Sequence, residues 1–298
     1  MKRACLLFIA LLNAILSADD VPRTAIVAAF PGEMESIRRV LDGERISKTM
    51  TINGVDFEMG EAYGVPVVFF MTRVSMTNAA MHTQLLLSHF NIERILFAGI
   101  AGGIDPKLKK GDVSVPTDWI HHIKSSFYNP KSEGSESYIF PSWRDTPEFA
   151  NFGMIHPERV EVLRDGLEEP EDRIKFPADP ALMKLAESAI VGNEIVNATG
   201  KAADISFGGV GVSGPIFMDN REYREFLFET WNAEVLDMES TAIAHVAWSN
   251  GVPCLIIRSI SDLAGGQEGH NEIYEFANLA QDNAAQVLDA VLRALSKE

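Results

Sequence analysis

Unbroken apolar runs alternate with amphipathic stretches along this chain. The runs at residues 24–30 (TAIVAAF), 94–99 (RILFAG) and 254–257 (CLII) are typical of strands that are covered on both faces. Residues 77–90 and 274–295 are amphipathic and predict helices. Strands that alternate with helices predict an α/β fold, in which helices cover both faces of a central sheet in three layers.

The most informative pattern lies in residues 235–262 (VLDMESTAIAHVAWSNGVPCLIIRSISD). A helix begins near Glu239 and ends at Gly251, because glycine accepts the left-handed conformation that closes a helix. The buried strand that follows runs into Asp262. Ligands of open α/β sheets bind outside the carboxyl ends of the strands, so Glu239 and Asp262 are candidate site residues.

Two further features map to strand ends. Glu35 falls in the first turn of a helix predicted at residues 33–41, directly after the first strand. Residues 99–103 (GIAGG) follow the second core strand, and their bare backbone lets a ligand approach closely. Each carboxylate also has an ordinary interpretation, as a helix-dipole partner or an N-cap. Together with the glycine-rich turn, the three carboxylates favour one shared site.

Periodicity fades over residues 119–180, which are rich in proline, glycine and serine. We interpret this stretch as a long excursion with a few short helices inside one domain of residues 19–298, because no repeat or linker divides the chain. Residues 205–212 predict a single glycine-rich strand.

The first 18 residues have the pattern of a secretory signal peptide. Lys2-Arg3 precede an apolar core at residues 4–16, and Ser17-Ala18 follow as small residues. The alternatives are a membrane anchor or a buried N-terminal strand, but the core is too short for a membrane span. We therefore expect a secreted protein, or one of the endomembrane or vacuolar lumen, with no membrane association after cleavage.

The net charge of the chain limits the kinds of ligand that it is expected to bind. The chain has 26 basic and 42 acidic residues, a net charge of −16, which argues against nucleic acid and leaves a small neutral ligand open. His121-His122 and His270 have no metal-binding spacing with nearby cysteine or acidic residues, so we expect no metal. No Gly-x-Ser-x-Gly elbow is present.

Several motifs resemble one known superfamily. Glu35 after the first strand, AGIAGGIDPKLKKGDV at 98–113, VLDMESTAIAHVA at 235–247 and RSISD at 258–262 resemble the purine nucleoside phosphorylase / uridine phosphorylase superfamily, and most of all its 5′-methylthioadenosine/S-adenosylhomocysteine nucleosidases. The signal and the motifs WRDTPEF and KFPADPALMKLA look like plant bark-storage and vegetative-storage relatives. The resemblance implies a three-layer αβα fold with a mixed, partly barrel-like central sheet.

The resemblance also implies roles. Asp262 would protonate N7 of a purine, Glu35 would act as general base toward water, and Arg258 would order both Glu35 and the water. Glu239 would bind the ribose hydroxyls. The remaining substrate-binding residues that it implies are Ile100, Ala101, Gly102, Phe217, Met218, Met238 and Ser261.

Two departures from the family pattern bear on the reaction. Ile100 stands where the nucleosidases have Ser or Thr, and residues 72–76 (TRVSM) replace a glycine-rich turn. Residues 96–98 (LFA) lack the arginine that phosphorylases use for phosphate, which favours hydrolysis unless Arg73 faces the site and binds an anion there.

We therefore expect cleavage of the N-glycosidic bond of a purine nucleoside by hydrolysis, with a phosphorylase and a storage or binding protein of the same fold as alternatives. We expect no cofactor, and phosphate would be a co-substrate only in a phosphorylase. Family members assemble as dimers or larger rings, so a homo-oligomer is expected.

Overall fold

A computed structural model describes residues 19–42, 44–144, 148–191, 195–196, 200 and 202–297 of the chain. The expected signal peptide, residues 1–18, lies outside the described residues. None of the described helices is long and apolar enough to span a membrane.

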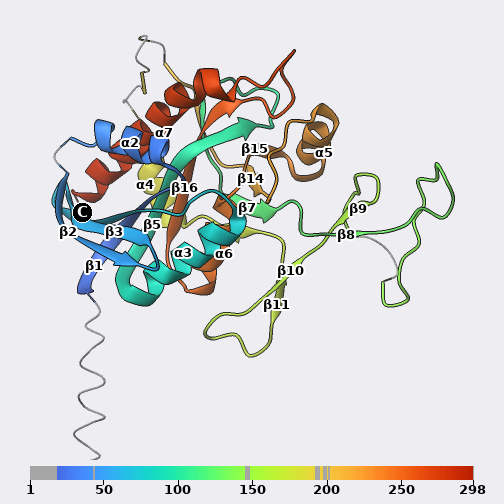
Figure 1. Cartoon of the computed structure of the whole chain (residues 1–298), viewed down its shortest axis with the longest axis horizontal. Helices are drawn as coiled ribbons and strands as arrows, with labels where there is room; N and C mark the ends of the chain where they lie inside the picture. Colours follow the sequence, from blue (N-terminus) through green and yellow to red (C-terminus); the bar gives the residue numbers. More distant parts are fainter. Residues whose placement is uncertain are drawn as a thin grey trace, which may run out of the picture.

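The centre of the molecule is a large mixed sheet (Figure 1). Its longest run of neighbours is β12 (Phe176–Pro177), β7 (Asp118–His121), β14 (Val210–Ser213), β15 (Ala233–Asp237), β5 (Phe90–Gly103), β1 (Asp19–Ala28), β4 (Val65–Met71), β3 (Val55–Ala62) and β2 (Arg45–Ile52). A branch adds β16 (Cys254–Asp262), β6 (Val113–Val115) and β13 (Ile205–Phe207). Both parallel pairs, such as β1 with β4, and antiparallel pairs, such as β3 with β4, occur.

The sheet divides along one edge of β5. The first part of β5 pairs with β1 up to Phe97, and its end pairs with β15 from Gly102 onward. Among the described strands none pairs with residues 98–101 on that edge, while β16 follows β5 along the other. This division leaves backbone N–H groups of β5 free for a side chain or a ligand, which is the usual place for a site in an α/β sheet.

Helices cover both faces of the sheet (Figure 1). One face carries α2 (Pro31–Val40), α4 (Pro180–Ile190) and α7 (Ile273–Leu295), and the other carries α3 (Met76–His89) and α6 (Ser240–Ser249). Successive residues of β1 point to opposite faces of the sheet: Ile26 packs in the core on the α7 face and Val27 in the core on the α6 face. The remaining helix, α5 (Arg221–Trp231), packs beside β15. The predicted three-layer α/β fold with a mixed sheet is confirmed.

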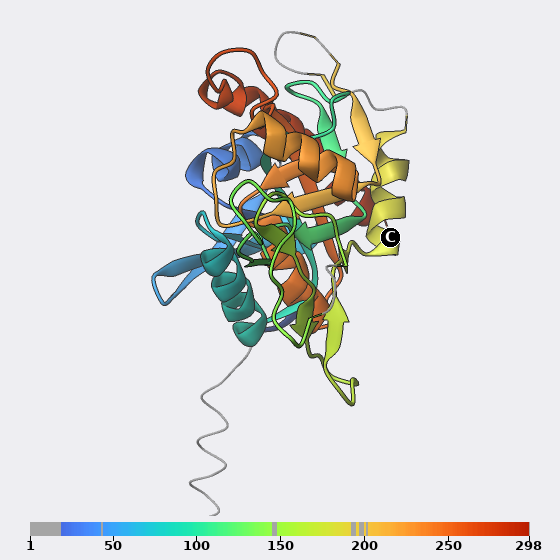
Figure 2. The ribbon, with the colours of Figure 1, turned by 90° about the vertical axis from the view of Figure 1, so that its right-hand side faces the viewer.

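The excursion projects from the body of the molecule (Figure 1), and its strands lie in front of the sheet in Figure 2. It contains two antiparallel strand pairs, β8 (Ser125–Phe127) with β9 (Ile155–Pro157) and β10 (Val160–Val162) with β11 (Glu171–Arg173). The expected short helices are absent from its described residues. Aromatic contacts replace them, since the His156 ring lies 4.9 Å from that of Tyr128 and 4.8 Å from that of Tyr138.

Two other expectations differ in detail. Residues 205–212 form two strands rather than one, because Gly208 and Gly209 take φ of +110° and +70°, which breaks the extended backbone between β13 and β14. The helix after Glu239 is preceded by strand β15, which the periodicity argument missed because its five residues are too few to show a period.

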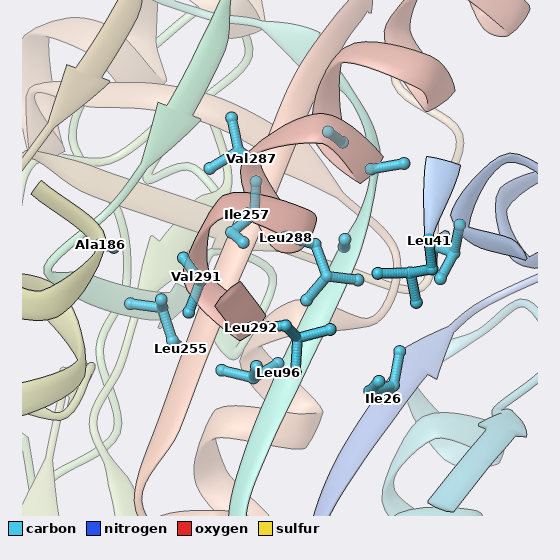
Figure 3. Close-up of a cluster of buried hydrophobic side chains, with 14 of the residues drawn as sticks. Ile26, Leu41, Leu96, Ala186, Leu255, Ile257, Val287, Leu288, Val291 and Leu292 are labelled. Carbon is cyan, nitrogen blue, oxygen red and sulfur yellow. The ribbon is translucent and has the colours of Figure 1, made fainter. Parts of the chain in front are cut away.

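Figure 3 shows part of the apolar core on the α7 face. Leu288 of α7 lies fully buried there, close to Leu96 of β5 and Ile257 of β16. Because a buried Leu→Ala change loses both transfer free energy and packing, we expect Leu288→Ala to lower the free energy of unfolding by about 3 kcal/mol in urea titrations.

Tyr274 on the same helix is the matched control, because it is 96% exposed. Tyr274→Ala should change the free energy of unfolding by less than about 0.5 kcal/mol. Equal effects of the two substitutions would contradict the placement of α7 on the sheet.

Candidate active site

A cavity of about 170 Å³ opens where the sheet divides. Nine of the residues that the sequence assigned to a substrate line it: Ile100, Ala101, Gly102, Phe217, Met218, Met238, Glu239, Ser261 and Asp262. The others that line it were not predicted: Phe30, Glu33, Val74, Ile216, Leu236, Asp237 and Ile273. Segments far apart in the sequence therefore meet at this cavity, whose lining combines carboxylates with apolar side chains.

Glu33 is the carboxylate that α2 contributes to the cavity. Its Oε2 accepts a hydrogen bond of 2.7 Å from the Ala29 N–H, and its Oε1 accepts one of 2.9 Å from the Ile100 N–H. The Ile100 N–H is available because no described strand pairs with that edge of β5. Burial raises the pKa of Glu33 above its ordinary value of 4.5, although the nearby Arg258 and the two N–H groups act in the opposite direction.

The prediction that Glu35 lies at this site is wrong. Glu35 is exposed on the opposite side of α2, whereas Glu33, Met34 and Ile37 are buried. The sequence held a signal for this, because Glu33 precedes Ile37 and Leu41 at the four-residue spacing of one helix face. Proximity to the strand end alone did not distinguish the two glutamates.

Arg258 lies fully buried beside Glu33. Its Nη1 is 3.5 Å from Glu33 Oε1, and its Nε is 2.7 Å from Asp237 Oδ2. The guanidinium also stacks over the Phe97 ring, 3.8 Å from the centroid. Neither Nη1 nor Nη2 has a hydrogen-bond partner among the residues that the structure describes, so the end of this buried cation has free donors.

Asp237 holds the other side of Arg258 and was not predicted. Its Oδ1 accepts a hydrogen bond of 2.5 Å from the Ser213 hydroxyl and one of 3.1 Å from the Ser240 N–H. These donors fix the carboxylate at the start of α6. The acid before Met238 in the DMES motif is the sequence signal that could have identified it.

Gly99 makes room for this cluster. A Cβ at Gly99 would lie 2.0 Å from Arg258 Nη1 and 2.1 Å from Glu33 Oε1. Packing therefore requires glycine at this position. Without a side chain at residue 99, Arg258 and Glu33 can both lie directly against the β5 backbone.

Glu239 reaches the cavity from the N-cap position of α6. Its Oε1 accepts a hydrogen bond of 2.8 Å from the Ser75 N–H. Ser75 has φ of +118°, a backbone conformation that favours glycine, so the turn at residues 72–76 is strained. Burial, and then the charge of Asp237, raises the pKa of Glu239 to about 8.

Asp262 is the last residue of β16 and also lines the cavity. Ala264 donates its N–H to Asp262 Oδ1 at 2.9 Å, and the Ser261 hydroxyl lies 2.9 Å from Oδ2. Asn271, which the sequence analysis did not single out, donates to Oδ1 at 3.2 Å. Phe217 lies beside the cavity with 59% of its surface exposed, and Met218 is buried below it.

Arg73 does not line this cavity. It lies with Arg38, Asp56 and Glu58 around a separate small cavity. The structure thus gives the anion-binding expectation for Arg73 no support at the site. Within the described part of the chain, no group of three or more His, Cys, Asp or Glu residues is arranged to hold a metal ion.

Known proteins similar to this chain span most of its length. A 5′-methylthioadenosine/S-adenosylhomocysteine nucleosidase of Mycobacterium tuberculosis is 24% identical over 279 residues, which cover 91% of this chain and 95% of the relative. Futalosine hydrolase of Helicobacter pylori has a TM-score of 0.67 at 20% identity, with 92% of this chain and 98% of that chain covered. The same nucleosidase from Neisseria meningitidis, in complex with methylthio-immucillin-A, has a TM-score of 0.67 at 22% identity and covers 92% and 99%.

The family model described as the phosphorylase superfamily matches residues 23–293, which include every element that lines the cavity. The resemblance drawn from the sequence motifs is confirmed at this level, and the relatives named above are nucleosidases and a related hydrolase. The chain belongs to the phosphorylase superfamily.

Proposed function

We propose that this protein hydrolyses the N-glycosidic bond of purine nucleosides of the adenosine or 5′-methylthioadenosine type. The observation that carries the proposal is the buried pair Glu33–Arg258, with an Nη1–Oε1 distance of 3.5 Å, beside a cavity that Asp262 also lines. The names of the relatives, which are nucleosidases acting on 5′-methylthioadenosine and S-adenosylhomocysteine, support it.

Glu33 is the general base in this mechanism. A water molecule that donates to the Glu33 carboxylate and accepts from a free N–H of Arg258 is held for attack on the anomeric carbon. Because Asp237 binds Arg258 from the other side, the guanidinium stays fixed while the proton moves to Glu33. The apolar surroundings exclude other water from the pair.

Glu239 binds the sugar. One ionised carboxylate accepts hydrogen bonds from both hydroxyls of a ribose diol, and it also stabilises the positive charge that develops on the ring as the glycosidic bond lengthens. Met238 lines the same part of the cavity and packs on the sugar. Positive groups at this position would oppose the transition state.

Asp262 acts on the leaving group. A carboxylic acid next to N7 donates a proton to the purine, which makes the base a better leaving group. Ser261, whose hydroxyl is 2.9 Å from Asp262 Oδ2, supports that carboxyl group. Phe217 and Met218 supply apolar surface for the face of the base.

Hydrolysis is favoured over phosphorolysis by the charges around the cavity. Arg73 lines a different cavity, and residues 96–98 place buried apolar side chains where the phosphorylases carry arginine. Arg258 is already shared by two carboxylates, Glu33 and Asp237, so a phosphate dianion there would meet two negative charges. Phosphorolysis is the alternative within the same class.

The apolar part of the cavity lining suits a nucleoside with an uncharged 5′ substituent. Phe30, Val74 and Ile273 line the cavity with apolar groups, and burying a charged 5′-phosphate against them would be unfavourable. A methylthio group loses little by the same burial. Homo-oligomer formation, secretion and a storage role stay predictions from the sequence.

Base release from adenosine, 5′-methylthioadenosine and inosine, followed with and without phosphate, tests the proposed function. We expect release without phosphate, because the Glu33–Arg258 pair can position a water molecule, whereas Arg73, the candidate phosphate ligand, lines a different cavity. Release only with phosphate would instead assign a phosphorylase. Absence of release from all three nucleosides by folded protein would overturn the proposal and favour a storage or binding role.

Substitution of the two neighbouring glutamates tests the general base. Glu33→Gln should lower kcat by about 10²- to 10⁴-fold, because the amide cannot accept the proton of the water. Glu35→Gln removes an exposed carboxylate from the same helix and should leave kcat within about twofold. Single-turnover base release measures both, and circular dichroism checks the fold. The reverse order of effects would return the base assignment to Glu35.

The pH profile follows from the raised pKa of Glu33. A general base works only when ionised, and burial raises its pKa, so the active form is lost at a higher pH than for an ordinary glutamate of pKa 4.5. We expect kcat/KM to fall on acidification with a midpoint clearly above 4.5. Glu239, with a pKa raised to about 8, must also ionise to bind the ribose and extends the rise toward that pH.

The Glu35→Gln protein should show the same acidic midpoint as the unchanged protein, because Glu35 is exposed outside the cavity. A midpoint at or below pH 4.5 for the unchanged protein would show that no buried carboxylate controls the reaction.

A further inference from the structure

Ser75 has a backbone conformation that only glycine adopts easily. It lies in the turn at residues 72–76, and its φ of +118° and ψ of +152° belong to a region that a Cβ atom makes unfavourable. Arg73 in the same turn also has a positive φ, of +64°. Strain of this kind persists only where the surrounding contacts hold it, and it is typical of functional sites. The contacts of Ser75 therefore indicate what its conformation provides.

Helix capping does not account for this conformation. Ser75 is the N-cap of α3, and its Oγ accepts a hydrogen bond of 3.3 Å from the Asn78 N–H. The N-caps of α4 and α5 make the same kind of side-chain bond with an ordinary negative φ, of −69° at Asp179 and −142° at Asn220. A side chain can thus cap a helix without a positive φ. The strained backbone of Ser75 has another consequence.

The other contact of Ser75 is with the proposed ribose-binding carboxylate. The Ser75 N–H donates a hydrogen bond of 2.8 Å to Oε1 of Glu239, which is buried and lines the cavity. The described residues supply no other hydrogen-bond donor to this carboxylate. Because the last torsion of a glutamate side chain is soft, packing alone does not fix the plane of its carboxylate. The Ser75 N–H fixes that plane.

Side chains of α3 hold the turn in its strained conformation. Asn78 Nδ2 donates a hydrogen bond of 2.9 Å to the Val74 carbonyl oxygen. Nδ1 of the buried His82 ring lies 2.6 Å from the Thr72 carbonyl oxygen, and it donates there because a carbonyl oxygen only accepts. Together with the bond from Asn78 to the Ser75 hydroxyl, these contacts keep the N–H of Ser75 directed at the cavity side of α6.

Glu239 keeps enough acceptor capacity for a sugar diol. Each oxygen of an ionised carboxylate has about two acceptor positions, and the Ser75 N–H takes only one of those on Oε1. Each oxygen can therefore accept one hydroxyl of a ribose diol, provided that the plane of the carboxylate is aligned with the diol. A 2′-deoxyribose has only one of these hydroxyls, so its binding depends less on the alignment.

We propose that Ser75 is a positioning residue for ribose recognition. The strained turn directs its N–H to Glu239, and the carboxylate oriented in this way selects ribonucleosides over 2′-deoxyribonucleosides. Ser75 does not line the cavity, so it acts through Glu239 rather than by touching the substrate. The inference rests on the proposed function, because it needs the sugar diol to lie against Glu239.

Ser75→Ala and Ser75→Gly separate the backbone conformation from the side chain. Alanine removes the Oγ that caps α3 and keeps the Cβ that makes φ of +118° unfavourable, so the turn relaxes and its N–H leaves Glu239. Glycine also removes Oγ, but it adopts this conformation without strain and keeps the N–H in place. We expect the ratio of kcat/KM for adenosine to that for 2′-deoxyadenosine to fall at least about tenfold in Ser75→Ala, and to stay within about threefold of the unchanged protein in Ser75→Gly.

Asp179→Ala is the matched control for the loss of a helix cap. Asp179 accepts hydrogen bonds of 2.9 Å from the Ala181 and Leu182 N–H groups at the start of α4, away from the cavity. This substitution should lower the free energy of unfolding and leave the ratio unchanged. The proposal would be overturned by an unchanged ratio in Ser75→Ala, by an equal fall in Ser75→Gly or in Asp179→Ala, or by a lack of preference for adenosine in the unchanged protein.

The proposed function and this inference can fail separately. If the folded, unchanged protein cleaves neither nucleoside, the proposed hydrolysis is wrong, and the ionisation of Glu239 is then followed by NMR of its carboxyl carbon. Burial, and then the charge of Asp237, raises the pKa of Glu239 to about 8, and the Ser75 N–H acts in the opposite direction. A pKa that rises further in Ser75→Ala but not in Ser75→Gly would support the positioning of Glu239 by Ser75. The same pKa in all three proteins would overturn it.

Discussion

The buried cation of Arg258 between Glu33 and Asp237 is the constraint on which the rest of the site depends. A guanidinium out of water is tolerable only with carboxylates and oriented donors around it. Two backbone N–H groups, from Ala29 and Ile100, fix Glu33, and the second of these is free only because the sheet divides along β5. Gly99 then lets both charges approach the strand. The division of the sheet along β5 therefore supplies the backbone N–H that holds Glu33, and Glu33 in turn pairs with the buried Arg258.

Acids with different surroundings lie along one cavity. Glu33, Glu239 and Asp262 are all buried. Burial raises the pKa values of Glu33 and Glu239, and Asp262 accepts hydrogen bonds from Ala264 and Asn271. Both donors lie in the segment that directly follows β16, so the chain after this strand determines the surroundings of the Asp262 carboxyl group.

The sequence was enough to predict the layers of the fold and most of the cavity. Apolar runs and glycine-terminated helices are local signals, and they placed Glu239 and Asp262 at strand ends. Glu33 was missed for Glu35 because their order along the chain does not say which one faces inward; the spacing to Ile37 does. Asp237 belongs to the DMES motif, but its contact with Arg258, like that of Asn271 with Asp219, joins residues distant in sequence and is not visible in a local pattern. The short helices expected in the excursion were wrong: its described residues form short strands, and aromatic contacts around His156 pack this segment.

The ends of the excursion meet in the sheet. β7 and β12 pair antiparallel, with Trp119 opposite Phe176, so the chain leaves and re-enters the body at neighbouring positions. The entropy of closing such a loop grows only with the logarithm of its length. Insertions or deletions between the two strands would therefore cost little stability, and the length of this segment is free to vary among relatives while the acids of the cavity keep their positions.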